Sequence, residues 1–115
     1  MTVVIVDGAN VVGSVPDGWW RDRRGAAERL RDRLVGYGER ENAEVVLVVE
    51  GAAKGIDAVP GVRVESATGS GDDLIVELVA ARGGRCVVVT ADRELRQRVE
   101  ALGASCAGPR TVREQ

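Results

Sequence analysis

Residues 3–10 read Val-Val-Ile-Val-Asp-Gly-Ala-Asn, a β-branched run that stops at an acid, a glycine and an amide. Short valine-rich runs also lie at 45–49, 62–64 and 87–89. The runs at 3–6, 45–49 and 87–89 do not alternate between apolar and polar side chains, and this pattern is typical of strands covered on both faces. We expect all four runs, the one at 62–64 included, to form strands that are covered on both faces.

Apolar side chains recur at helical spacing between these runs. Three such stripes are formed by Ala27, Leu30, Leu34 and Tyr37, by Leu74, Ile75, Leu78 and Val79, and by Leu95, Val99 and Leu102. Strands and helices therefore alternate along the chain, which predicts a three-layer α/β/α fold with helices on both faces of a mostly parallel sheet. We expect four to five strands, the fifth being a short one near residues 104–107.

Chain length and composition predict a single domain. The 115 residues are 44% hydrophobic and 30% charged, which suits one soluble globular core. We expect this domain over residues 1–107 and a polar, frayed tail over residues 108–115. Residues 36–43 are expected to form a polar helix exit and loop, and residues 51–60 a loop that contains glycine and alanine.

The N-terminal residues carry no basic segment before their apolar run, so we interpret them as a strand and not as a signal peptide. No apolar run approaches the roughly 18 residues that span a bilayer. These features predict a cytoplasmic protein that has no membrane partner.

The residue types present limit the chemistry. The chain contains no histidine, which excludes Ser-His and Cys-His nucleophile systems and imidazole ligands. Cys86 and Cys106 lack CxxC spacing, and we interpret them as small core residues. The net charge of −2 gives no overall basic footprint for nucleic acid. Any chemistry must therefore rest on carboxylates.

Acids follow the apolar runs at the end where parallel strands bind ligands. Asp7 and Glu50 come directly after two of the runs, and Asp92 follows a third within three residues. Asp72 and Asp73 open the second predicted helix, which starts at the same edge if it runs antiparallel to the strands. Because ligands bind beyond the carboxyl ends of such strands, we expect these acids to gather at one edge of the sheet.

Each acid also has a structural interpretation. Asp7 can shape a turn, and Asp92 is a good N-cap. Ser70 and Asp73 have the spacing of a capping box. Gathered carboxylates repel one another, however, and raise one another's pKa unless a cation compensates. At about 100° per residue, Asp72 lies roughly 90° from the centre of its helix's apolar stripe and Asp73 roughly 170°, so Asp72 is the better candidate to face the sheet edge.

A site built only from oxygen ligands suits Mg²⁺ or Mn²⁺. These ions keep several waters and complete their coordination shells with substrate phosphate. Such an ion can deprotonate a water and neutralise charge on the phosphate. The absence of histidine is no obstacle to this chemistry.

Three motifs stand in order along the chain. They are Val-Ile-Val-Asp-Gly-Ala-Asn-Val-Val-Gly at 4–13, Gly-Ser-Gly-Asp-Asp-Leu-Ile at 69–75 and Val-Val-Thr-Ala-Asp-Arg-Glu-Leu at 88–95. In this order they resemble the NYN domain of the PIN-like nuclease superfamily, especially the YacP-like bacterial ribonuclease group. The resemblance covers nearly the whole chain and implies a metal-dependent endoribonuclease that hydrolyses phosphodiester bonds in single-stranded or structured RNA.

The same resemblance implies roles for particular residues. Asp7, Asp72 and Asp92 would bind Mg²⁺ or Mn²⁺, and Asn10 would act with them by orienting water or a neighbouring carboxylate. Glu50 stands where relatives often show Asp, so its role as a ligand stays open, as does that of Asp73. The chain is also short for a YacP-like protein.

An aromatic and basic segment precedes the first predicted helix. Residues 16–21 read Pro-Asp-Gly-Trp-Trp-Arg and lie beside the predicted site. Base stacking on an aromatic ring contributes about 1 to 3 kcal/mol, and nearby arginines can hold phosphates. The alternatives are core packing of one tryptophan and an ion-paired helix face for the arginines. The predicted RNA contacts are Trp19, Trp20, Arg21, Arg23, Arg24, Thr90 and Arg93.

Other functional classes fit the sequence less well. Toprim domains lead with Glu and carry an Asp-x-Asp, and receiver domains need an acidic pair after the first strand and a late Lys; neither pattern is present. Gly8-Ala9-Asn10 lacks the glycine spacing of a dinucleotide-binding loop, so no nucleotide cofactor is expected. A catalytically weak RNA-binding or protein-interaction module with a PIN-like fold stays open, as does a homodimer.

Overall fold

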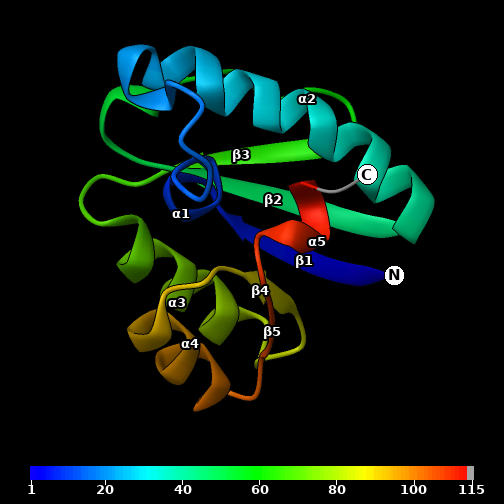
Figure 1. Ribbon diagram of the computed structural model, residues 1–115. Coiled ribbons are helices and arrows are strands. Elements are labelled where there is room, and N and C mark those ends of the chain that lie inside the picture. The colour runs from blue at the N-terminus through cyan, green and yellow to red at the C-terminus, as the bar shows by residue number, and fades with distance from the viewer. Residues whose placement is uncertain (114–115) are drawn as a thin grey trace.

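Five parallel strands form a sheet in the computed structural model of the chain, which describes residues 1–113 (Figure 1). The strands are β1 (Thr2–Asp7), β2 (Ala43–Val49), β3 (Val62–Ser66), β4 (Val87–Val89) and β5 (Ser105–Ala107). The helices are α1 (Gly8–Val12), α2 (Arg23–Glu41), α3 (Gly71–Ala81), α4 (Arg93–Glu100) and α5 (Arg110–Arg113), and the 3-10 turns are η1 (Trp19–Arg21) and η2 (Gly51–Ala53). The predicted three-layer α/β/α fold with a parallel sheet is confirmed. Across residues 1–113, no helix is both long and apolar enough to cross a membrane.

The strand order is β3-β2-β1-β4-β5, which puts β1 at the centre. From β1 the chain moves outward to β2 and β3, then returns past β1 to β4 and β5. The direction reverses between the carboxyl ends of β1 and β4, and open parallel sheets bind ligands at such a switch point. The registers place Asp7 opposite Val48 and Val6 opposite Val89. Asp7 and Thr90, the residue after β4, therefore flank the switch point.

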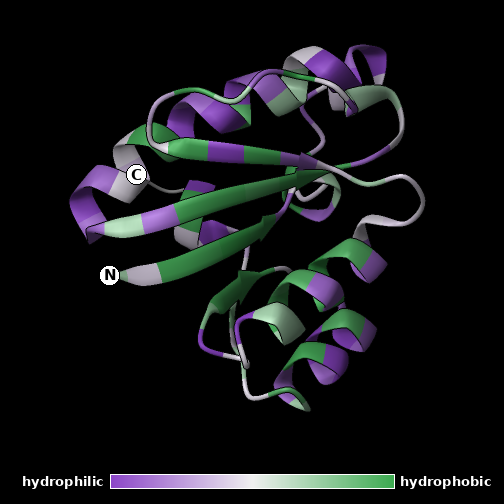
Figure 2. Ribbon diagram, turned by 180° about the vertical axis from the view of Figure 1, so that it is seen from behind, coloured by the Kyte–Doolittle hydropathy of each residue, from purple (hydrophilic) through white to green (hydrophobic). Residues whose placement is uncertain are grey.

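Successive residues of the strands point into two separate cores. Val6 packs with side chains from α1, α2 and α5, whereas Ile5 packs with side chains from α3 and α4. Figure 2 shows the central strands as hydrophobic along most of their length. Leu34 of α2 and Ile75 of α3 are completely buried, and burial of this kind contributes roughly 1.5 to 3 kcal/mol per aliphatic side chain. A core on each face is the reason why the runs in β1, β2 and β4 do not alternate.

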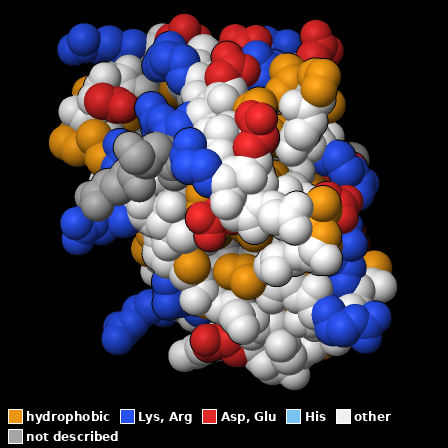
Figure 3. All heavy atoms as spheres, turned by 90° about the vertical axis from the view of Figure 1, so that its right-hand side faces the viewer, with side chains coloured by type: hydrophobic (Ala, Val, Ile, Leu, Met, Phe, Trp, Pro, Cys, Tyr) orange, Lys and Arg blue, Asp and Glu red, His pale blue; other side chains and the backbone are white. Residues whose placement is uncertain are grey.

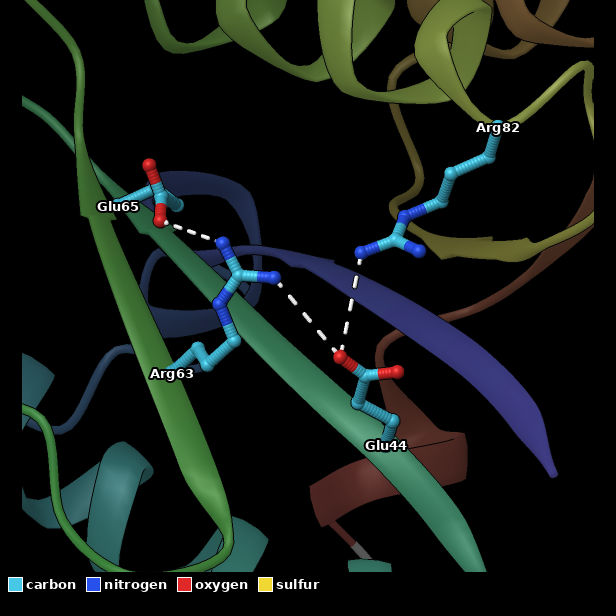
Figure 4. A network of polar contacts seen from close by, with 4 residues as sticks. All are labelled: Glu44, Arg63, Glu65 and Arg82. Atoms are coloured by element: carbon cyan, nitrogen blue, oxygen red, sulfur yellow. Dashed lines mark hydrogen bonds and ion pairs between the residues drawn. The ribbon is translucent and has the colours of Figure 1, made fainter.

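The edge strand β3 does not follow the prediction that every strand is covered on both faces. Val62 is buried on the α2 side, but Arg63 and Glu65 occupy the other face, where α3 and α4 do not extend over this edge (Figure 1). Arg63 lies 3.0 Å from Glu65 and 3.8 Å from Glu44, which in turn lies 4.0 Å from Arg82 (Figure 4). Charged side chains on an edge strand oppose pairing with another chain.

Three segment boundaries also differ from the sequence-based expectation. Helix α2 continues to Glu41 and ends at Asn42, whose left-handed backbone (φ 51°) terminates it, so residues 36–43 are mostly helical. Residues 110–113 form α5 and bury Val112 in the α2-side core, whereas the sequence predicts a frayed tail there. Residues 114–115 lie outside the described part. Leu102 lies beyond α4 and is exposed.

The close approach of α1 to β2 predicts that Gly8 tolerates no side chain. A Cβ atom there would lie 2.5 Å from the carbonyl oxygen of Val48, which is backbone and cannot rotate away. We expect Gly8→Ala to lower the free energy of unfolding by about 2 kcal/mol, as overpacking of a rigid site does. Urea denaturation measures this change.

The matched control is Gly69→Ala, because a Cβ atom at Gly69 would meet nothing within 4 Å. Similar stability of the two variants would contradict the close approach of α1 to β2.

Candidate functional site

Asp7 ends β1 and caps α1 at the switch point. The residue is 4% exposed, and its Oδ2 accepts a 2.9 Å hydrogen bond from the hydroxyl of Thr90. Its Oδ1 accepts a longer one, 3.4 Å, from the backbone N–H of Asn10. No arginine or lysine within residues 1–113 forms a salt bridge with it. Burial raises the pKa of Asp7 to about 6, and the two hydrogen bonds oppose this rise only in part.

Thr90 and Asn10 fasten the segment after β4 to the segment after β1. The completely buried hydroxyl of Thr90 donates to Asp7 and accepts from the backbone N–H of Asp92 at 3.1 Å. The side-chain oxygen of Asn10 accepts from the backbone N–H of Ala91 at 2.8 Å. The burial of Thr90 excludes the direct RNA contact that the sequence predicts for it. The side-chain oxygen of Asn10 is thus engaged by backbone, and the role in orienting water or a carboxylate that the resemblance implies stays a prediction.

Asp92 has the capping role that the sequence offers as its structural interpretation. Its Oδ1 accepts a 2.9 Å hydrogen bond from the backbone N–H of Leu95 in the first turn of α4. Its charge nevertheless acts on the site, because Asp92 raises the pKa of Asp72. The cap and the electrostatic role therefore coexist.

Asp72 and Asp73 differ as the helical phase predicts. Asp72 is partly buried, whereas Asp73 is exposed and pairs with Arg98 at 3.1 Å. Burial raises the pKa of Asp72, the charges of Asp92 and Glu50 raise it further, and Arg98 opposes the rise. Asp72 therefore belongs to the acidic edge, and Asp73 lies outside it.

Glu50 follows β2 and lies against the start of α3. A Cβ atom at Gly71 would be 2.8 Å from Oε1 of Glu50, so the glycine makes room for the carboxylate. The charge of Glu50 raises the pKa of both Asp7 and Asp72. Acids with raised pKa thus lie at the carboxyl edge of the sheet, whereas acidic and basic side chains are interspersed on the side where β1 begins (Figure 3).

The acids are electrostatic neighbours, but they do not converge on one point. In the described part of the chain, no group of three or more acidic or cysteine side chains is close enough to hold a metal ion. Asp7, Asp72 and Asp92, the ligand set that the family resemblance implies, therefore do not form such a group among the described residues.

A cavity of about 300 Å³ opens beside these acids, between α1, α2 and η2. Its walls include the aliphatic side chains of Val12, Ala27, Val49 and Ala53, and Glu50 also lines it. The sequence gives no sign of this cavity, because an aliphatic residue in a helix or turn looks the same whether it lines a cavity or fills a core.

The two tryptophans differ in their surroundings. Trp19 is partly buried and lines the cavity, whereas Trp20 is 48% exposed and does not. Their rings meet edge to face, with centroids 5.8 Å apart. The guanidinium carbon of Arg23 lies 5.3 Å from the ring centroid of Trp19, and that of Arg21 lies 5.9 Å from the ring centroid of Trp20. The sequence does not indicate which tryptophan would contact RNA, but the structure shows that Trp19 lines the cavity and Trp20 does not.

The remaining arginines predicted to bind RNA lie elsewhere. Arg24 donates hydrogen bonds to the carbonyl oxygens of Lys54 at 2.7 Å and Gly55 at 3.2 Å, which ties α2 to the loop after η2. Arg93 begins α4 and is exposed. Of the predicted basic contacts, Arg23 alone is among the residues that line the described cavity.

Solved structures of one protein share this arrangement of strands and helices. Rae1 (YacP) from Bacillus subtilis matches with a TM-score of 0.82 at 22% identity, over 99% of this chain and 72% of that one. This chain has a YacP-like fold. A mutant of the same protein matches with a TM-score of 0.78 at 21% identity, over 99% of this chain and 74% of that one. No protein-family model and no curated protein matches the sequence.

This YacP-like fold holds Asp7 at a cost in stability that depends on pH. The pKa of about 6 in the folded chain lies above the ordinary value of 3.8, so folding favours the protonated form. The contribution of Asp7 to stability is therefore present in full below about pH 4 and is lost as the pH rises through about 6. We expect Asp7→Asn to raise the free energy of unfolding by on the order of 2 kcal/mol near pH 8, and by much less near pH 4.

Urea denaturation at several pH values measures this difference. Asp57→Asn removes one negative charge at an exposed position and serves as the control. If Asp7→Asn raises the free energy of unfolding by the same amount at every pH, the ionised form of Asp7 does not destabilise the folded chain.

Proposed function

We propose that the chain is a divalent-metal-dependent endoribonuclease, in which the acids at the carboxyl edge hold Mg²⁺ or Mn²⁺ against an RNA phosphate. The observation that carries this proposal is Asp7, a buried carboxylate at the switch point with no cationic partner in the described part of the chain. An unpaired buried charge is costly, and perturbed acids of this kind concentrate at functional sites. A bound cation would offset the cost.

Asp7 and Asp72 are the proposed protein ligands of the ion. Both have a raised pKa, and the charge of Asp72 acts on Asp7. Mg²⁺ sites commonly use only one or two carboxylates and take their other ligands from waters and substrate phosphate, so a third converging acid is not required. When bound, the ion would activate a water and neutralise charge on the phosphate.

Three other residues have supporting roles in this proposal. Glu50 and Asp92 add negative charge next to Asp72, which strengthens the attraction for a cation. Asn10 holds the segment after β4 through Ala91 and so positions that charge. The YacP-like fold, together with the three ordered motifs, supports this reading of the edge as a nuclease site.

An RNA-binding or protein-interaction module that does not cleave is the second candidate. Two observations favour it: no group of three acids within residues 1–113 converges, and the net charge is −2. A module of this kind needs no cation at Asp7, and it binds RNA equally well after the metal is removed.

The nuclease proposal predicts that the purified chain cleaves single-stranded RNA with Mn²⁺ or Mg²⁺ and is inactive after chelation. We expect Asp7→Asn and Asp72→Asn each to lower the cleavage rate at least about a hundredfold, because each removes a metal ligand. Gel analysis of a labelled RNA measures the rate, and circular dichroism checks that the variants fold.

Asp73→Asn is the matched control, since it removes the same charge from the next residue, which is exposed and paired with Arg98. Equal damage by Asp73→Asn and Asp72→Asn would overturn the ligand assignment. Cleavage in a chelator would overturn the metal dependence, and binding without cleavage on a broad RNA panel would favour the non-catalytic module.

A further inference from the structure

The cavity between α1, α2 and η2 is continuous with the acidic edge. Gly8 and Ala9, the two residues after Asp7, form part of its lining. Glu50 also belongs to the lining, and its charge acts on Asp7 and Asp72. The cavity therefore opens next to the place where an RNA phosphate would lie at the acids.

The cavity walls fit a flat, apolar group better than a phosphate or a sugar. Val12, Ala27, Val49 and Ala53 give it aliphatic walls that cannot hydrogen-bond to hydroxyl or phosphate oxygens. Its volume of about 300 Å³ lies at the lower end of the range for small-ligand pockets, which suits one planar ring system.

Trp19 and Arg23 give this cavity a surface on which a nucleobase can stack. Both residues line it, and the guanidinium group of Arg23 lies over the Trp19 ring. The cation–π contact between the two groups is attractive. Both groups are also planar surfaces on which bases can stack. Trp20 lies outside the lining, so it cannot serve the same purpose without moving.

We propose that this cavity binds one nucleobase of the RNA, next to the phosphate held at Asp7 and Asp72, with Trp19 as its stacking wall. The identity of the ligand as RNA rests on the proposed function. The base lies on the α2 side of the sheet edge and the phosphate toward α3, so the two parts of one nucleotide are recognised by different layers.

The experiment compares two single-stranded oligomers in a chelator, so that no cleavage occurs. One is built only of abasic ribose phosphates, and the other carries a single base at its centre. A single base removes any ambiguity about register along the strand. We expect the single-base oligomer to bind the unmodified chain about tenfold more tightly, as stacking of one base predicts, measured by fluorescence anisotropy.

Paired variants assign this difference to the cavity. Trp19→Leu is expected to abolish it, whereas Trp20→Leu keeps it. Trp20→Leu also leaves Trp19 as the only tryptophan, since the chain has two, so its fluorescence should be quenched by the single-base oligomer and not by the abasic one. Ala53→Phe fills the cavity from another wall and should likewise abolish the difference, while Ala52→Phe, at an exposed neighbour outside the lining, should not.

Ala53→Phe keeps the test decisive if Trp19→Leu fails to fold. Equal affinity of the two oligomers for the unmodified chain would overturn the proposal, as would a base-dependent difference that survives in Ala53→Phe. Because binding is measured without metal, the outcome is separate from that of the cleavage assay. A base-dependent difference without any RNA cleavage would leave this site standing and remove the nuclease function.

Discussion

The hydroxyl group of Thr90 lies between two acids, and the geometry of the site depends on it. It donates the one short hydrogen bond that Asp7 receives, and it accepts the backbone N–H of Asp92. The same contact spans the switch point between β1 and β4. Because Thr90 is completely buried, water cannot replace its partners, so breaking the contact would leave unsatisfied polar groups in the core. The acidic edge therefore keeps its shape only while β1 and β4 stay in register.

The rest of the fold stabilises what the site destabilises. The ionised form of Asp7 is disfavoured by burial, and Asp72 and Glu50 add to the repulsion. The two apolar cores on either face of the sheet provide the stability that offsets this cost. The position of Asp7 also separates two surfaces, with the apolar cavity toward α2 and with Asp72 and Asp92 toward α3 and α4. One nucleotide can thus present its base to one layer and its phosphate to the other.

The fold was predictable from sequence wherever burial acts on a whole segment. Burial leaves a local pattern in the sequence of these segments. In β2 and β4 the pattern is an unbroken apolar run, and in α3 it is an apolar stripe at helical spacing. The prediction that β3 is covered on both faces was wrong, because α3 and α4 do not extend over that edge and Arg63 can form ion pairs there. Helix α5 was not predicted, because one buried residue, Val112, in a polar segment gives no repeating pattern.

The site was predictable only where local geometry decides. Helical phase separated Asp72 from Asp73, but Thr90 and Asp7 are 83 residues apart in sequence, so their hydrogen bond follows from tertiary structure alone. The most direct test of the central claim is an NMR titration of the Asp7 carboxyl carbon with and without Mg²⁺. We expect a midpoint near pH 6 that moves to lower pH when Mg²⁺ is added. A midpoint near the ordinary value of 3.8, or one that Mg²⁺ does not move, would contradict a cation site at this carboxylate.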